Sequence, residues 1–106
     1  MSSTSMELVV SRDFDGYLVN YFLTKQPVAD VWSHCDEHVY GVYLEMTDKG
    51  GSVLKDGREP QGGNVSNIRE DALKVIQILN DMEVEPIQFL DVIDEAMVKA
   101  GLVEAY

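Results

Sequence analysis

Residues 66–101 decide the fold, and they read SNIREDALKVIQILNDMEVEPIQFLDVIDEAMVKAG. In the first half of this stretch, Asn67 and Glu70 have the spacing of a helix capping box, with Ser66 just before them. Apolar residues then recur at three- and four-residue intervals, the spacing of one face of an α-helix. They are Ile68, Ala72, Val75, Ile76 and Leu79. The pattern predicts a helix that begins near Asn67 and buries this stripe.

The second half of the stretch predicts another helix, which opens at Pro86. Glu85 is its expected cap, with Gln88 three residues on, and Val84 and Phe89 occupy the positions of a hydrophobic staple. Its apolar stripe consists of Phe89, Ile93, Ala96 and Ala100. Gly101 ends the helix as a left-handed cap. Because the connection over residues 80–85 is short, we expect the two helices to be antiparallel neighbours, a helical hairpin.

The segments before residue 66 carry the signature of strands. Alternating apolar residues predict strands at Met6–Val10 and Val39–Thr47, and residues 13–16 and 48–51 have the composition of tight turns. Tyr17–Thr24 fits a strand that forms a hairpin with the first, because it is rich in β-branched and aromatic residues. A buried helix is the alternative for that segment, since some of its polar residues also fall at helical spacing.

Three further segments complete the expected architecture. Pro27 predicts the start of a short helix near residues 27–36, Ser52–Lys55 a short partner strand, and Asp56–Asn64 a loop with several Gly and Pro residues. The fold class is therefore α+β, with a three- or four-stranded antiparallel sheet packed against the C-terminal helical hairpin. Residues 1–5 are expected to be a disordered tail and residues 6–106 a single domain.

Composition narrows the classes of function. The chain has 106 residues, of which 45% are hydrophobic, and its net charge is −11. Direct binding of nucleic acid or of an anionic membrane surface is disfavoured, because both need Lys and Arg. The N-terminus does not resemble a signal peptide, and the single cysteine, Cys35, fits a reducing compartment, so a cytoplasmic location is expected.

The acidic residues are concentrated towards the C-terminus. From residue 70 onward nine acidic and two basic residues give −7, whereas ten acidic and six basic residues before that point give −4. A solvated surface that keeps the protein soluble is one explanation. The other is a docking face for a basic protein surface, reached by electrostatic steering. The residues expected to form this face are Asp81, Glu83, Glu85, Asp91, Asp94 and Glu95.

One local cluster has the chemistry of a metal ligand set. His34 and His38 fit the pattern H-x-x-E-H, in which two histidines on one helix face can hold a metal ion. No third ligand is marked by the sequence, and the next predicted strand begins at Val39. We therefore expect a polar helix end here, no metal site, no cofactor and no catalytic residues.

The leading hypothesis is a small acidic binding protein, not an enzyme, that masks a basic and possibly nucleic-acid-binding surface of a protein partner. Its size, acidity and lack of a catalytic set are typical of small protein inhibitors such as immunity proteins and phage counter-defence proteins. One alternative is a metal- or small-ligand-binding domain that uses His34 and His38. Another is an oligomerising structural or assembly protein. The chain is expected to be a monomer or a homodimer.

Overall fold

The computed structural model of the chain describes residues 5–14, 16–27, 38–54 and 60–102. Its elements are β1 (Ser5–Phe14), β2 (Tyr17–Pro27), β3 (His38–Thr47), β4 (Gln61–Ser66), α1 (Arg69–Asp81), the 3₁₀ turn η1 (Pro86–Gln88) and α2 (Phe89–Lys99). The four strands form one antiparallel sheet in the order β1-β2-β3-β4. The predicted α+β class is confirmed, with four strands in the sheet.

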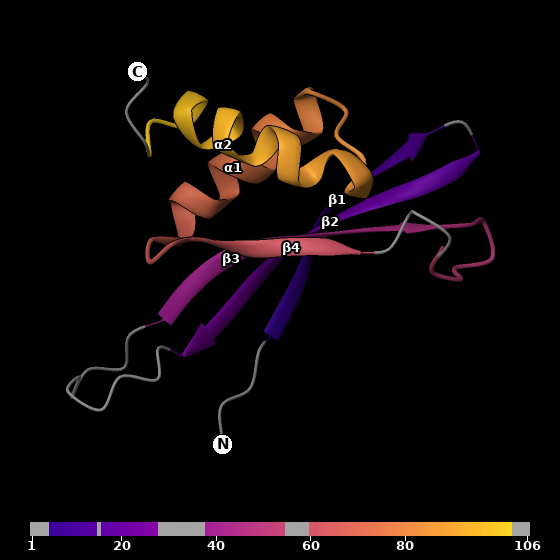
Figure 1. Ribbon diagram of the computed structural model, residues 1–106. Helices are drawn as coiled ribbons and strands as arrows, with labels where there is room; N and C mark the ends of the chain where they lie inside the picture. Colours follow the sequence, from indigo (N-terminus) through magenta and orange to yellow (C-terminus); the bar gives the residue numbers. More distant parts are fainter. Residues whose placement is uncertain (1–4, 15, 28–37, 55–59, 103–106) are drawn as a thin grey trace.

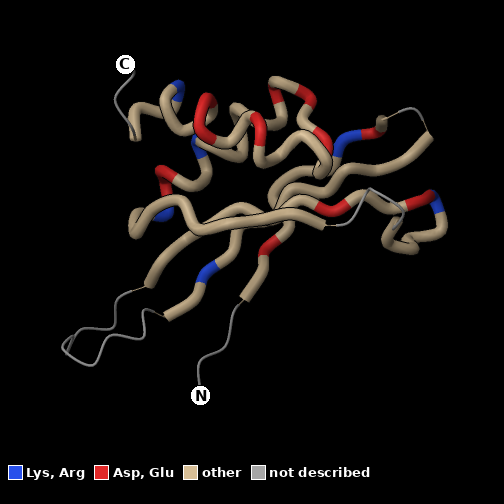
Figure 2. The backbone as a smooth tube through the Cα atoms, in the orientation of Figure 1, with Lys and Arg blue, Asp and Glu red and all other residues tan. Residues whose placement is uncertain are grey.

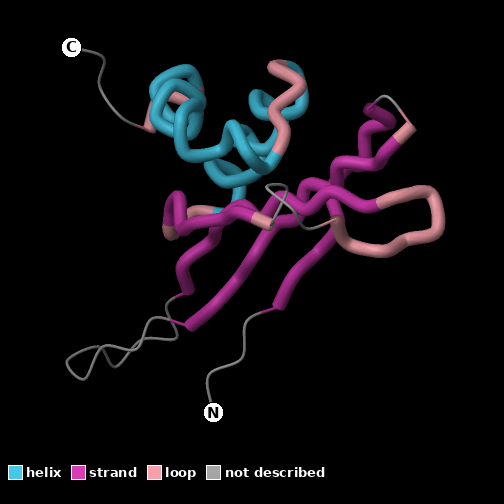
Figure 3. Tube along the Cα trace, turned by 45° about the vertical axis from the view of Figure 1, so that its right-hand side comes forward, coloured by secondary structure: helices cyan, strands magenta, loops and turns pink. Residues whose placement is uncertain are grey.

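The helices form a second layer on one face of the sheet (Figures 1 and 3). α1 packs across all four strands, whereas α2 packs against α1 and β4. The chain reverses after α1, so that α2 runs back beside it (Figure 1). Among the described residues, no helix has both the length and the apolar character needed to cross a membrane.

The core lies between this face of the sheet and α1. Alternate residues of β2 and β3 point towards the helices, as expected for strands with one covered face. The buried hydrophobic residues are Val19, Tyr21, Leu23, Val42, Leu44, Met46, Ala72, Val75, Ile76, Leu79, Val84, Phe89 and Ala96. This alternation decides between the two predictions for Tyr17–Thr24, which is a strand and continues to Pro27.

Both predicted turns are present. Phe14 pairs with Tyr17 across the first turn, where Gly16 has a φ of 89°. In the second, the Asp48 Oδ1 atom accepts hydrogen bonds from the backbone N–H groups of Gly50 and Ser52, each at 2.9 Å. Gly51 has a φ of 89°, a conformation that glycine adopts without a steric penalty.

The fourth strand is not where the sequence predicted it. In the described part of the segment 52–55, residues 52–54, the structure gives only an isolated bridge between Val53 and Thr47. The loop prediction for Asp56–Asn64 is wrong from Gln61 onward, because Gln61–Ser66 pairs with β3 along its length. Gly62 and Gly63 made this segment resemble a loop, but they lie inside the strand.

Two other boundaries also differ from the predictions. Pro27 does not begin a helix; it is the last residue of β2 and pairs with His38, a strand end where the missing N–H is tolerated. The rest of the predicted short helix lies outside the described residues. Ser5, assigned to the disordered tail, is the first residue of β1.

The N-terminus of α1 is capped differently from the prediction. The helix begins at Arg69, and the residue at its N-cap is Ile68, which is exposed rather than part of the buried stripe. Ser66 replaces the predicted Asn67–Glu70 capping box: its Oγ accepts the Ile68 N–H at 3.0 Å and donates to Asp71 at 3.1 Å.

The ends of the second helical segment confirm the predictions. Glu85 and Gln88 form a capping box, in which the Gln88 side chain accepts the Glu85 N–H at 3.0 Å. Gly101 has a φ of 81° and donates to the Val98 carbonyl, while the Leu102 N–H reaches the Met97 carbonyl, each at 3.0 Å. This pair of bonds is a Schellman motif.

The connection between the helices is fastened to the sheet by two side chains. Arg12 of β1 donates to the carbonyl of Asn80 at 2.7 Å and to its Oδ1 at 3.0 Å, and it pairs with Glu83 at 3.1 Å. The buried Tyr21 hydroxyl of β2 donates to the Val84 carbonyl at 2.7 Å. The positive charge of Arg12 beside the last carbonyls of α1 also interacts favourably with the helix dipole.

The close approach of β4 to β3 predicts a contrast between two glycines. A Cβ atom on Gly41 would lie 2.5 Å from the Gly63 carbonyl oxygen and 2.7 Å from the Thr24 hydroxyl, whereas one on Gly63 would meet nothing within 4 Å. Gly41→Ala should lower the free energy of unfolding by about 1–3 kcal/mol, the usual cost of overpacking. Gly63→Ala, measured in the same urea titration, should change it by less than about 0.5 kcal/mol. Equal effects of the two substitutions would contradict the close β3–β4 packing.

The Tyr21 hydroxyl predicts a second measurable effect. Tyr21→Phe leaves the buried Val84 carbonyl without its donor and should lower the free energy of unfolding by about 1–3 kcal/mol. Tyr43→Phe is the matched control, because that ring lies at the partly exposed surface of the sheet and should cost about 0.5 kcal/mol or less.

The same residue predicts a pH dependence. Burial raises the pKa of Tyr21 from 10.0 to about 12, with Arg12 opposing the shift and Glu83 and Glu85 adding to it. The unfolded chain therefore releases this proton first, so the stability contributed by the neutral phenol is complete below pH 10 and falls as the pH rises towards 12. Urea titrations across this range should show a steeper loss for the wild type than for Tyr21→Phe. Parallel curves would contradict the assignment.

Candidate functional site

The connection between the two helices, which carries several of the predicted acidic residues, has a fixed conformation. α1 ends in a Schellman arrangement, in which Glu83 donates to the Asn80 carbonyl and Val84 to the Leu79 carbonyl, each at 3.1 Å. Glu83 occupies the position that favours glycine, with a φ of 56°. A residue with a side chain is kept in this conformation by the surrounding bonds, so the direction of the chain after α1 is fixed.

The six acidic residues predicted as the docking face do not have equivalent surroundings. Glu83 is paired with Arg12, Glu85 belongs to the capping box, and Glu95 lies 3.6 Å from Lys99 one turn later on α2. Asp81 accepts a long hydrogen bond of 3.4 Å from Gln77. The Glu85–Gln88 spacing was visible in the sequence, whereas the partner of Glu83 depends on the fold.

Asp91 and Asp94 are the two predicted residues that remain exposed and uncompensated. Within the described part of the chain, neither carboxylate has a hydrogen bond or an ion pair. Figure 2 shows acidic positions distributed along the helical layer with few basic ones between them. The negative potential of α2 is therefore available to a partner at these two carboxylates.

Two large apolar side chains near these carboxylates in the chain are exposed, Ile87 in the turn before α2 and Leu90 on α2, and the sequence analysis missed them. Ile87 is 66% exposed and Leu90 is 71% exposed. At 100° per residue, Leu90, Asp91 and Asp94 fall on one side of α2, opposite the side that includes the buried Phe89 and Ala96. The signal was present in the sequence, since Leu90 does not belong to the apolar stripe that begins at Phe89. We call Ile87, Leu90, Asp91 and Asp94 the outer α2 surface.

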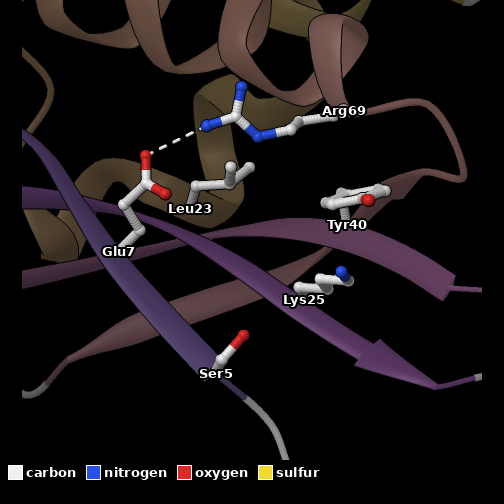
Figure 4. A pocket seen from close by; sticks show the side chains of 6 residues that line it. All are labelled: Ser5, Glu7, Leu23, Lys25, Tyr40 and Arg69. Carbon is white, nitrogen blue, oxygen red and sulfur yellow. Dashed lines mark hydrogen bonds and ion pairs between the residues drawn. The ribbon is translucent and has the colours of Figure 1, made fainter.

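A hollow lies at the opposite end of the helical layer, under the first turn of α1 (Figure 4). Ser5, Glu7, Leu23, Lys25, Tyr40 and Arg69 line it. Arg69 spans the hollow and pairs with Glu7 at 3.0 Å. The volume is about 170 Å³, below the few hundred Å³ of typical small-molecule pockets. It is a less convincing site than the outer α2 surface.

The metal hypothesis depends on His34 and His38, and the structure describes only the second of them. His38 is the first residue of β3 and has an extended backbone. His34 lies outside the described residues. Across residues 5–14, 16–27, 38–54 and 60–102, no three His, Cys, Asp or Glu side chains are grouped so that they could hold a metal ion.

Comparison with known proteins places the chain in a family. No curated protein and no solved structure matches it significantly. A family model matches residues 3–99, which include every strand and both helices, and the chain therefore belongs to a family of unknown function (DUF6514).

Proposed function

We propose that this protein acts by binding a protein partner, not by catalysis, and that the outer α2 surface is the contact. The partner presents an apolar side chain flanked by basic ones. In its inhibitor-like form the interaction masks a basic surface of the partner, which can be one that otherwise holds nucleic acid. The observation that supports it is the exposure of Leu90 on the same side of α2 as two uncompensated carboxylates, with the exposed Ile87 in the turn just before the helix.

The energetic roles of the two residue types differ. Burying a large aliphatic side chain contributes about 1.5–3 kcal/mol, whereas an exposed ion pair contributes about 1 kcal/mol or less. Leu90 and Ile87 therefore supply most of the affinity. Asp91 and Asp94 speed association with a positively charged partner and select against an acidic one.

The rigidity of α2 supports this role. The segment is fixed at its start by the Glu85–Gln88 capping box and at its end by the Schellman motif at Gly101. Its inner side is buried through Phe89 and Ala96. A contact surface that is already ordered loses little conformational entropy on binding.

A peptide probe tests the proposed chemistry. We expect the protein to bind a fluorescent amphipathic helical peptide of Lys and Leu more tightly than a scrambled peptide of the same composition. Leu90→Ser should weaken binding roughly tenfold, the loss expected from one buried aliphatic side chain. Asp91→Lys with Asp94→Lys should weaken it more at low salt than at high salt, because exposed charges are screened.

Two control variants test whether binding depends on the outer α2 surface itself or only on the overall charge and number of exposed apolar residues. Val53→Ser removes another exposed aliphatic side chain, and Asp13→Lys with Glu70→Lys changes the net charge by the same amount elsewhere. Both controls should bind like the wild type. The same proteins then serve as baits in cell lysate, where a partner should be retained by the wild type and both controls and lost by the two α2 variants. Equal binding by all of them would refute the proposal.

A further inference from the structure

The face of the sheet that points away from the helices carries an apolar row. Directly opposed residues of antiparallel strands point to the same face, so Leu8, Phe22 and Tyr43 lie side by side on β1, β2 and β3. The rings of Phe22 and Tyr43 meet edge to face with centroids 6.0 Å apart. Gly62 continues the row on β4, and the exposed Met6 lies beside it in the next row. We call Leu8, Phe22, Tyr43 and Gly62 the central row.

This face is most exposed on β1, whereas Phe22 and Tyr43 are partly exposed and Thr47, at one end of the face, is buried. Leu8 is 54% exposed and Met6 52%, and both described helices lie on the other side of the sheet (Figure 3). Large apolar side chains grouped on one surface of a small protein usually mark an interaction site. An uncovered sheet face also commonly packs on another sheet, with about 10 Å between the two.

The charge of this face differs from that of the rest of the molecule. By register, the described strand residues on it include two charged side chains, Asp13 and Glu45, both on the same side of the central row. The remaining polar groups are neutral, among them the Ser11–Asn20–Thr47 chain of hydrogen bonds. In a protein of net charge −11, a surface with so few acidic side chains lessens the repulsion between two copies.

We propose that this face is a homodimer interface, formed when a second copy packs face to face across a two-fold axis parallel to the central row. Such an axis places the central row of one copy on the central row of the other, because C2 interfaces are self-complementary. It also inverts the strand direction, so that Asp13 and Glu45 of one copy lie over the Met6 and Thr24 end of the other. The four acidic groups of the dimer are thereby kept apart.

The dimensions of the face suit a small dimer interface. Strands of 10, 11, 10 and 6 residues, about 4.8 Å apart and at about 3.3 Å per residue, give a face of roughly 600 Å². Two such faces amount to about 1,200 Å², at the lower bound for specific protein interfaces. A charged partner would meet few opposite charges here, whereas a second copy offers a matching apolar row. The helical layers point outward in this dimer, so that it presents two outer α2 surfaces to one partner or to two.

Sedimentation velocity over a wide concentration range tests the dimer with the full chain. The wild type should shift from monomer to dimer with rising concentration, and Leu8→Glu should weaken the dimer roughly tenfold or more, since it places two like charges at the interface. Leu90→Glu is the control: the same change at a more exposed leucine on α2 should leave the dimer unchanged. Thermal melts by circular dichroism verify that each variant is folded, and Met6→Glu replaces Leu8→Glu if the latter unfolds.

Salt gives an independent readout that separates this inference from the proposed function. Screening of the net negative charge should strengthen the dimer as salt rises, whereas binding to the basic peptide through α2 should weaken. A wild type that remains monomeric at every concentration, or a dimer that Leu90→Glu disrupts and Leu8→Glu does not, overturns the inference. Neither result affects the test of the outer α2 surface.

Discussion

The burial of one face of β2 and β3 under α1 is the constraint on which the other features depend. Val19, Tyr21 and Leu23 share this face with the alternate residues of β3, and Ala72, Val75, Ile76 and Leu79 of α1 cover them. Because side chains alternate between the two faces of a strand, a shift of one residue would expose this entire set. The same burial therefore determines which residues are left on the other face and which side of α2 remains in solvent.

Tyr21 joins this core to the polar contacts that orient the helices. Its ring is fully buried, while its hydroxyl reaches the Val84 carbonyl just after α1. Arg12, on the neighbouring strand, holds the carbonyl of Asn80 and the side chain of Glu83. Apolar burial alone would let α2 rotate around α1, since it is not directional. The two hydrogen-bonding side chains fix the connection, and with it the direction in which Leu90 and Asp94 point.

The extent to which the sequence predicted this structure depended on the kind of signal. The two helices, and both ends of the second helical segment, were predictable from the sequence. Their signals, which are the apolar period, the Glu85–Gln88 spacing and Gly101, act locally. The roles of the acidic residues were not, since Glu83 finds its partner on a strand 71 positions earlier in the chain. Leu90 was not among the predicted residues, because the charge pattern that predicted the docking face includes no apolar side chains. In the proposed function, such residues supply most of the affinity.

The error at β4 has a physical explanation that also bears on the uncovered face. Glycines in a sequence usually indicate a loop, but here they let two strands approach: a Cβ on Gly62 would lie 2.7 Å from the Val42 carbonyl oxygen and 3.1 Å from the Tyr43 ring. The side chain that would otherwise stand beside Tyr43 is absent, so the ring has no neighbour on the β4 side within its row. The feature that concealed β4 in the sequence therefore also flattens the central row. Another flat surface can pack against a flat apolar row. A bulky side chain on β4 at the end of the row would prevent this packing.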